Sequence, residues 1–561
     1  MLIGRHTVVI GAALGALMMV AAPGITRAQA TAGIGDDAIP LPAKGTRIRI
    51  VGLWENYDYR FAPTANGGSA KSRLFSGFSR DNFGAADFTA LSGAQDNIRG
   101  LSGLDDAFTL SFGRLEAKGD VTKSIVPLQI DVGITNRLSL SLLVPYVETR
   151  SASSFVLNRG GTGANVGKNP AIASATSRAT NNTVATQIAA SRALLSAEIA
   201  RCAYVNATGG GCASIRANPA AAQSLLTQSE TFRTQLSALY GTATATGAAV
   251  VPLTNSTAQA QIVAKLAELR MGFVNFASNS LDALSRPVGA SFIYATGSLQ
   301  DMAKDSLFGV GYDTLAIGGR SGMGDVELSA NFLLLNSLGK SQSDRLTLSR
   351  KGIRTQMSGG WRFGTATGGR TGNPFDLPTG DGANALLLRS TTDLIWSRRF
   401  WVSGTVRYAK PLSDNVTTRF APVSDSTLFR PSYVFNAKRS LGAHTELEIA
   451  PRFGIGNAFG LSAAYRLARQ AGSTINPIFD PLFDPAEGFS VTGYSTSATT
   501  VQSIFFGASY STMNAFVRGK SRWPLEVIYS HGLVLGASGG VVPATVTDRI
   551  ELRIYTRFPR R

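Results

Sequence analysis

The chain has 561 residues, of which 44% are hydrophobic and only 16% are charged, and its formal net charge is +18. A length of this order would allow several soluble domains. However, sparse charge and a mean hydropathy of +0.07 are typical of a transmembrane β-barrel, in which lipid-facing and polar residues alternate. Basic chains commonly bind nucleic acid. An exported chain would not meet nucleic acid, and this sequence carries a signal that predicts export. Lipid phosphates or an anionic solute suit an exported chain better.

The first thirty residues predict export. Arg5 and His6 form a basic start, an apolar run follows over residues 8–22, and Ala28-Gln29-Ala30 is a small-residue cleavage site. This order predicts a secretory signal peptide at 1–30. The apolar run is shorter than the roughly 20 residues that a spanning helix needs, and no later segment is a continuous apolar helix of that length. We therefore expect the mature chain in an outer membrane, with its lipid as a partner and no nucleic acid.

Alternating side chains predict the first strands. Residues 46–59 predict a strand, the polar, glycine-rich residues 62–104 a long loop, and residues 108–112 the start of another strand. The clearest hairpin turns at Thr135-Asn136-Arg137, and a turn this short is typical of the periplasmic side of bacterial barrels. One face of that hairpin is apolar on both sides of the turn: Leu128, Ile130, Val132, Ile134, Leu138, Leu140, Leu142, Val144 and Tyr146.

The character of the sequence changes over residues 158–290, which predict a helical insert. Residues 160–182 predict a flexible linker. Behind it, apolar residues recur at helical spacing in three stripes, so we expect a small bundle of three short amphipathic helices. Cys202 and Cys212 are ten residues apart in an exported chain, where thiols meet oxidising conditions, and we predict a disulfide between them.

Strand patterns return at Gly324 and continue to the end of the chain. The last one is clear, because apolar residues from Ile550 to Phe558 alternate with charged or polar residues such as Glu551 and Arg553. Further candidates lie at 351–364, 384–396, 400–410, 427–437, 444–455, 459–468, 498–511, 523–534 and 547–558. Because single-chain bacterial barrels have even strand numbers, we expect about 14 strands, with 12 as the alternative.

The predicted fold class is an all-β membrane protein, a transmembrane antiparallel β-barrel carrying an inserted small α-helical subdomain. Residues 1–30 are the signal peptide, 31–157 the N-terminal part of the barrel, 158–290 the helical insert with its linkers, and 291–561 the remainder of the barrel. The side of the membrane that carries the insert stays open. The tight turn places it outside the cell, whereas counting strands back from a periplasmic C-terminus places it in the periplasm.

Residues that carry catalytic or metal chemistry are scarce. The mature chain has two histidines, His444 and His531, and neither lies in a sequence pattern of the outer-membrane phospholipases or proteases. No closely spaced set of metal ligands occurs. The glycine-rich run at 160–168 fails as a phosphate loop, because Asn169 stands where Ser or Thr is required. We therefore expect no enzyme, no cofactor and no bound metal.

By alternation, a set of charged residues points toward the lumen of the predicted barrel. Both signs occur in similar number, so two interpretations remain. The charges select solutes in an open pore, or they form a salt-bridge network that fills and rigidifies a narrow barrel. The candidate lumen-lining residues are Asp131, Glu327, Arg354, Arg362, Arg407, Glu446, Glu448, Arg452, Arg466, Glu551, Arg553 and Arg557.

Five different short motifs lie along the predicted barrel. They are Leu41-Pro42-Ala43-Lys44-Gly45, residues 133–140 with Val144-Pro145-Tyr146, residues 322–328, residues 377–382 and residues 401–412. In these motifs the chain resembles the outer-membrane proteins of the MetA-pathway phenol-degradation family, distant relatives of hydrophobic-substrate transporters. The resemblance implies a passive outer-membrane channel or transporter for small solutes, including hydrophobic or aromatic compounds. It implies no catalytic or binding residues, and the helical insert departs from the family's pattern.

Two functions follow from the sequence. The first is a channel or transporter that passes a small solute down its gradient without energy input. The alternative is a non-transporting surface protein, whose barrel displays the helical insert for partner binding or adhesion. The solute, the state of the pore and the oligomeric state are not determined by the sequence.

Overall fold

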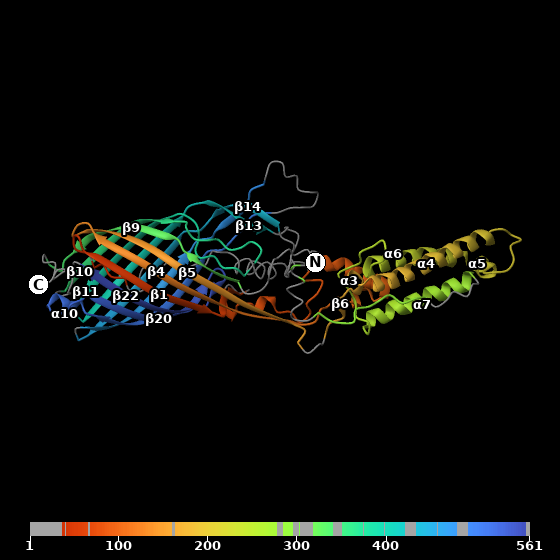
Figure 1. Ribbon diagram of the computed structural model, residues 1–561, viewed down its shortest axis with the longest axis horizontal. Coiled ribbons are helices and arrows are strands. Elements are labelled where there is room, and N and C mark those ends of the chain that lie inside the picture. Colours follow the sequence, from red (N-terminus) through yellow and green to blue (C-terminus); the bar gives the residue numbers. More distant parts are fainter. Residues whose placement is uncertain are drawn as a thin grey trace.

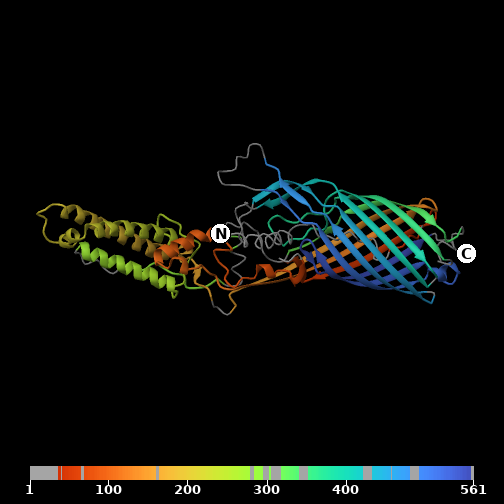
Figure 2. The ribbon, with the colours of Figure 1, turned by 180° about the vertical axis from the view of Figure 1, so that it is seen from behind.

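The computed structural model shows a barrel joined at one end to an elongated helical region (Figures 1 and 2). It describes residues 36–39, 41–64, 68–159, 163–277, 284–294, 302, 304, 318–339, 351–373, 375–397, 399–420, 433–456, 458–479 and 492–556. The signal peptide predicted at 1–30 lies outside the described residues. The predicted fold class, an antiparallel barrel with a helical insert, is confirmed.

Each wall strand is antiparallel to both neighbours, and the sheet closes on itself because β4 pairs with β5 along their whole length. Twelve strands go round the wall. A further strand, β8 (Gly318–Met323), pairs with residues 146–151 of β5, next to the part of β5 (residues 138–143) that pairs with β9. The wall strands are β1 (Thr46–Tyr57), β4 (Leu115–Gly133), β5 (Leu138–Leu157), β9 (Val326–Asn336), β10 (Gly352–Phe363), β11 (Ala385–Ile395), β12 (Phe400–Pro411), β15 (His444–Ile455), β16 (Phe459–Gln470), β19 (Thr499–Ser511), β20 (Leu525–Ser538) and β22 (Val546–Thr556).

The expected number of about 14 strands is wrong, and the alternative of 12 is right, because two predicted strands lie outside the wall. Residues 108–112 form only isolated bridges, at Ser111 and Phe112. The candidate at 427–437 corresponds to β14 (Tyr433–Ser440), while residues 427–432 lie outside the described residues. β14 belongs to a separate four-stranded sheet with β13 (Asp414–Phe420), β17 (Thr474–Pro477) and β18 (Tyr494–Ser495). Alternation therefore identified a strand here but not its sheet.

The corrected count also removes the conflict over orientation. Thr46 pairs with both Val132 and Thr556, so the tight turn at 134–137 and the end of β22 lie at the same end of the barrel. The connections at 396–399, 456–458 and 512–524 lie there too. We call this the short-turn end. The helical region leaves from the opposite end, after Leu157. The tight turn and the strand count from the C-terminus therefore place the helical insert at the same end of the barrel.

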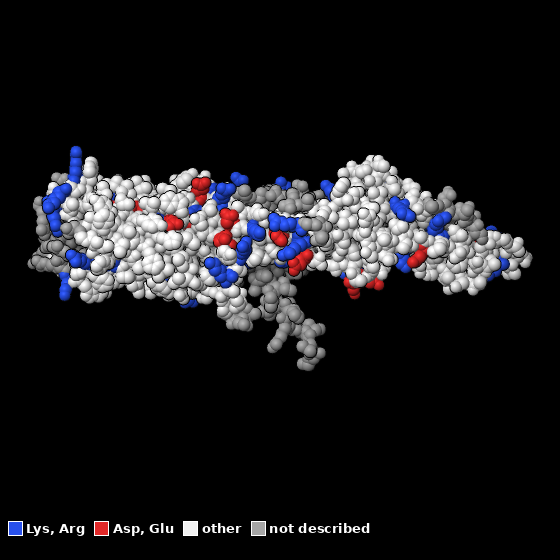
Figure 3. Space-filling view, turned by 90° about the horizontal axis from the view of Figure 1, so that it is seen from below, with Lys and Arg blue, Asp and Glu red and all other residues white. Residues whose placement is uncertain are grey.

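The outer face of the wall is apolar. Leu128 pairs with Ile50 and Val144 across neighbouring strands, and Leu128 and Ile50 are exposed although they lie mid-strand. Charged side chains are few along the middle of the barrel face seen in Figure 3 and gather toward its ends. Aromatic pairs such as Trp396–Phe400 and Phe459–Tyr510 lie at the short-turn end. An apolar belt edged by aromatic residues is the surface that a bilayer requires of a barrel.

The helical region is built from two parts of the chain. Helix α2 (Ser92–Ser102) lies in the predicted loop at 62–104, which also contains β3 (Ser69–Arg73), and α2 packs into the same apolar core as the insert helices. The predicted linker at 160–182 instead contains β6 (Val166–Lys168), α3 (Pro170–Ala173) and the start of α4. The insert helices are α4 (Ala175–Cys202), α5 (Cys212–Ala217), α6 (Pro219–Tyr240) and α7 (Thr257–Ala277).

Local capping explains where these helices begin. Ser174 accepts a hydrogen bond from the backbone N–H of Ser177 at the start of α4, and Asn218 caps α6, whose first residue is Pro219. The predicted disulfide is confirmed: it joins Cys202 at the end of α4 to the start of α5, with a Cα–Cα distance of 5.1 Å. Across the described part of the chain, every helix is too short or too polar to cross a bilayer.

Candidate functional site: a charged barrel lumen

A short N-terminal segment lies inside the barrel. At the short-turn end, Leu41 is buried against Tyr555 of β22 and Phe516 of α10 (Met513–Val517). Further into the lumen, the backbone N–H of Ala38 donates to Asp393 Oδ2 on β11 over 2.9 Å. We call residues 36–39 the N-terminal strap. Two acidic side chains of this strap, next to each other in sequence, meet arginines of the wall.

Asp36 binds arginines from three strands. Its carboxylate lies 3.1 Å from Arg389 Nη1, 3.4 Å from Arg407 Nη2 and 3.5 Å from Arg49 Nη2. Its backbone carbonyl accepts a hydrogen bond from Arg452 Nη2 over 3.0 Å. The side chain of Asp36 is buried, so these arginines replace the water that a free carboxylate would bind.

Asp37 completes the contact on the other side of the strap. Its Oδ2 atom lies 3.2 Å from Arg553 Nη1 and 3.8 Å from Arg452 Nη1. The five arginines that touch the strap are Arg49, Arg389, Arg407, Arg452 and Arg553, and we call them the strap arginines. They come from β1, β11, β12, β15 and β22, so barrel closure is what brings them together.

The wall carries its own ion pairs around the strap. Glu551 is fully buried and accepts hydrogen bonds from Arg49 Nε at 2.7 Å, Arg553 Nε at 2.7 Å and Arg549 Nη2 at 2.5 Å. Nearby, Arg354 and Asp393 form a pair in which both side chains are fully buried. Such pairs are expensive to break, because the partner that remains is a buried, uncompensated charge.

The structure places the predicted lumen-lining residues on the inner face of the wall, with one exception: Arg557 lies outside the described residues. The others are paired with one another or with neighbours. Arg362 binds Glu327 and Asp381, Arg407 binds Glu446 and Glu448, Arg466 lies near Glu446, and Arg47 binds Asp131. Among the two interpretations offered by the sequence, the salt-bridge network is therefore present.

Several residues of the site escaped the sequence reasoning. Arg47, Arg49 and Arg549 alternate with apolar neighbours and carried the same signal as the predicted set. Arg389 follows three successive leucines, so its strand does not alternate clearly between apolar and charged residues, and the face of Arg389 could not be assigned. Asp36 had no signal at all, because a segment that enters the lumen without forming a strand has no periodicity.

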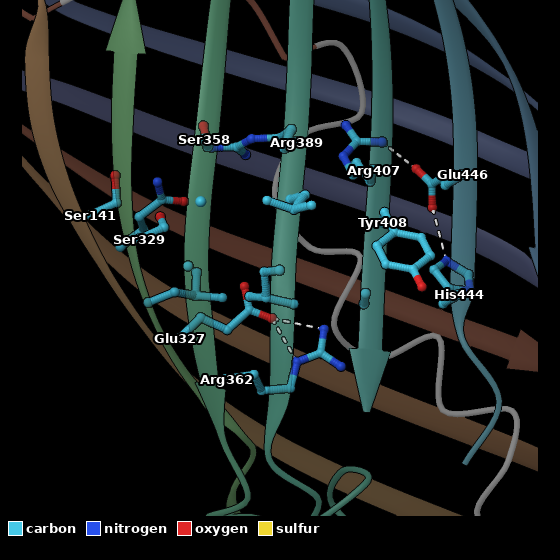
Figure 4. A pocket seen from close by; sticks show the side chains of 17 residues that line it. Ser141, Glu327, Ser329, Ser358, Arg362, Arg389, Arg407, Tyr408, His444 and Glu446 are labelled. Atoms are coloured by element: carbon cyan, nitrogen blue, oxygen red, sulfur yellow. Dashed lines mark hydrogen bonds and ion pairs between the residues drawn. The ribbon is translucent and has the colours of Figure 1, made fainter. Parts of the chain in front are cut away.

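A cavity that is open to solvent lies beside this network within the lumen. Arg389 and Arg407 contribute to its wall, and Leu143, Leu387 and Ala409 contribute apolar surface. Figure 4 shows that the labelled lining side chains come from a run of neighbouring strands, with Glu446 between Arg407 and His444, and with Glu327 hydrogen-bonded to Arg362. The cavity therefore combines three guanidinium groups, those of Arg362, Arg389 and Arg407, with an apolar surface.

The two histidines occupy different places. His444 borders the cavity, 3.7 Å from Glu446 Oε2. His531 Nδ1 lies 2.9 Å from Asp548 Oδ1, which also accepts the hydroxyl hydrogen of Tyr529 at 2.9 Å. This Asp partner comes from the adjacent strand and was not visible in the local sequence of His531. The pair shares its face with the exposed Tyr529, on the outside of the barrel and away from the lumen.

No protein-family model matches the sequence, and no curated protein matches it. Solved structures to which this chain is similar include an outer membrane channel from Pseudomonas putida F1, at 9% identity and a TM-score of 0.40, covering 93% of this chain and 99% of that one. The Pseudomonas putida toluene transporter TodX matches at 11% identity and a TM-score of 0.26, covering 92% of each chain. A Pseudomonas aeruginosa FadL homologue matches at 8% identity and a TM-score of 0.25, covering 93% of this chain and 94% of that one.

Proposed function

We propose that this protein is an outer-membrane channel that lets small solutes pass down their gradient, and that the described state is its closed state. The observation that carries this proposal is the solvent-open cavity inside a wall whose hydrogen-bonded ladder is complete. A closed ladder leaves no unsatisfied strand edge in lipid, and the apolar belt supplies the outer surface. The strap lies across the lumen without belonging to the wall, so it can leave without breaking the barrel.

The orientation follows from the lengths of the connections. Bacterial barrels have short turns on the periplasmic side and long loops outside. The short-turn end, with both chain termini of the wall, would therefore face the periplasm. The helical region would lie outside the cell, and the strap would enter the lumen from the periplasmic side.

Small aromatic or hydrophobic compounds are the proposed solutes. Leu143, Leu387 and Ala409 give the cavity an apolar side, which a purely hydrophilic pore would not need. The barrel motifs shared with the MetA-pathway phenol-degradation family support the same class. This activity needs neither catalysis nor a cofactor.

The test is the conductance of the refolded mature protein in a planar bilayer, compared with a variant that lacks residues 31–39. The truncated protein keeps Leu41 and every wall strand. We expect rare openings of the full chain and sustained ohmic steps from the truncated chain. A correctly folded truncated barrel that stays silent would contradict the channel function.

A second candidate function is display of the helical region to a partner. It is favoured by the disulfide-closed loop at the far tip of the helices, where Tyr204 is 75% exposed and Val205 is 90% exposed. Because α2 packs with the insert helices, a clean deletion must remove both parts. Tyr57 pairs with Val121 and Ser151 pairs with Gly318, so residues 58–120 and 152–317 can each be replaced by a short turn.

The remaining barrel separates the two functions. A channel should still conduct after this double deletion, whereas a display protein should keep its fold and lose adhesion of whole cells that carry it. Reduction of the Cys202–Cys212 disulfide serves as the matched control for damage confined to the tip.

A further inference from the structure

We infer that the strap arginines form a binding site for the carboxylate of a small organic acid, and that Asp36 and Asp37 occupy this site in the closed state. The inference rests on the proposed channel function and names the ligand class of its lumen. An acid that enters the lumen would compete with the strap for the same guanidinium groups, so the solute itself would open the channel.

The strap supplies negative charge that the wall lacks. In the described structure, the ion pair of Arg389 is with Asp36, and that of Arg452 is with Asp37. Wall carboxylates of the same network, such as Asp393 and Glu551, are already paired with other arginines. When the strap leaves, Arg389 and Arg452 therefore face the lumen as cations that need an anion.

The strap is held in the lumen by side-chain and single backbone contacts. It forms no strand pairing with the wall, and its contacts are those of a ligand: carboxylates on guanidinium groups, one carbonyl that accepts from Arg452, and one N–H that donates to Asp393. The planar fork of arginine suits a carboxylate, whichever molecule carries it. Leu41 anchors the strap at the periplasmic mouth, so a displaced strap stays nearby and can return.

The lining of the cavity decides which kind of carboxylic acid fits the site. Arg389 and Arg407 contact Asp36 and also line the solvent-open cavity. A carboxylate placed on these two arginines would leave its body in the cavity that Leu143 and Leu387 also line. The site therefore fits a monocarboxylic acid with a compact apolar body, such as an aromatic acid, better than a sugar or a neutral hydrocarbon.

Calorimetric binding to the refolded full-length mature protein in detergent tests the site, with benzoate as the probe and benzyl alcohol as its uncharged analogue. We expect benzoate to bind the Asp36→Asn/Asp37→Asn double variant about tenfold more tightly than the wild type, because a competing ligand has been weakened. Arg389→Gln in that background should weaken benzoate binding about tenfold, the usual worth of one charge-assisted contact. Benzyl alcohol should not distinguish these proteins.

Matched controls use exposed residues of the same barrel. Asp120→Asn on β4 and Arg137→Gln in the tight turn change the same charges away from the lumen and should leave benzoate affinity unchanged. A thermal shift guards against misfolding, since benzoate should raise the melting temperature of the double variant more than that of the wild type. Equal benzoate affinity in the wild type and the double variant would overturn the inference, and so would benzyl alcohol binding as tightly as benzoate.

The two proposals fail separately. Benzoate binding with a silent truncated channel would support the carboxylate site and contradict the channel. Conductance of the truncated chain with no benzoate binding, and with no block of its current by benzoate, would support the channel and overturn the site.

Discussion

Replacing Glu551 with glutamine should weaken the barrel strongly, although the change removes one charge and almost no volume. The carboxylate of Glu551 is 0% exposed and receives hydrogen bonds from Arg49, Arg549 and Arg553. Glutamine keeps one acceptor oxygen but offers NH₂ donors to groups that can only donate. Three guanidinium groups would then share a buried space without the anion that compensates them.

The magnitude follows from the cost of breaking a buried ion pair. Removing one partner of such a pair typically costs about 3–5 kcal/mol, because the other charge stays buried and uncompensated. Asp37 also contacts Arg553, at 3.2 Å, so part of the charge remains balanced. We therefore expect a loss in the free energy of unfolding near the lower end of that range, about 3 kcal/mol.

Tryptophan fluorescence during urea unfolding in detergent is a suitable assay. The chain has five tryptophans, at positions 54, 361, 396, 401 and 523, and each of them lies in a wall strand or in a turn at the short-turn end. The signal therefore follows the barrel and ignores the helical region. The control is Glu148→Gln, an exposed carboxylate on β5, which should change the free energy of unfolding by less than about 0.5 kcal/mol.

The reasoning is refuted if Glu551→Gln and Glu148→Gln unfold at the same urea concentration with the same slope. A smaller slope in the first variant alone would instead mean that its folded barrel is less compact, and the free energies could not then be compared directly.

Reducing the Cys202–Cys212 disulfide should lower the stability of the helical region by about 2–3 kcal/mol, because the unfolded chain regains the freedom of a short loop. Helical circular dichroism should show this loss while tryptophan fluorescence stays unchanged. Leu128→Arg should make the free energy of folding into liposomes less favourable by about 2–4 kcal/mol, because Leu128 faces lipid. Val205→Arg, at the exposed tip of the helical region, should leave that free energy unchanged. Heat-dependent gel mobility, which separates folded from unfolded barrels, checks both variants. Leu41→Ala should loosen the anchor of the strap and raise the open probability of single channels, and unchanged closed times would show that Leu41 does not hold the strap.

The local pattern of the chain was sufficient for most of the wall. A strand alternates its side chains between two faces, so Glu551 and Arg553 could be assigned to one face and Ile550 and Leu552 to the other from spacing alone. The hairpin at 134–137 was readable because its turn is short and both its strands are regular. The disulfide was predictable because an exported chain with two cysteines has a single possible intramolecular pairing.

Local pattern failed where an element's partner is distant in sequence. The strand at 433–440 alternates like a wall strand, but its partners are β13 and β17, and only the completed sheets reveal this. Helix α2 was hidden in a polar loop, because its apolar face is narrow and its partners lie more than a hundred residues later, in α6 and α7.

The sequence by itself predicted export, and it determined that the chain forms an antiparallel barrel with one charged face and that its two cysteines pair. These properties depend on the composition of short segments and on a period of two residues, which each segment carries on its own. Only the tertiary structure decided that there are twelve wall strands and that Glu551 binds Arg49, 502 residues away. It also decided that Asp36 and Asp37 occupy the lumen. Closing the barrel brings distant strands to one axis, and nothing in a short stretch of sequence records which charges will meet there.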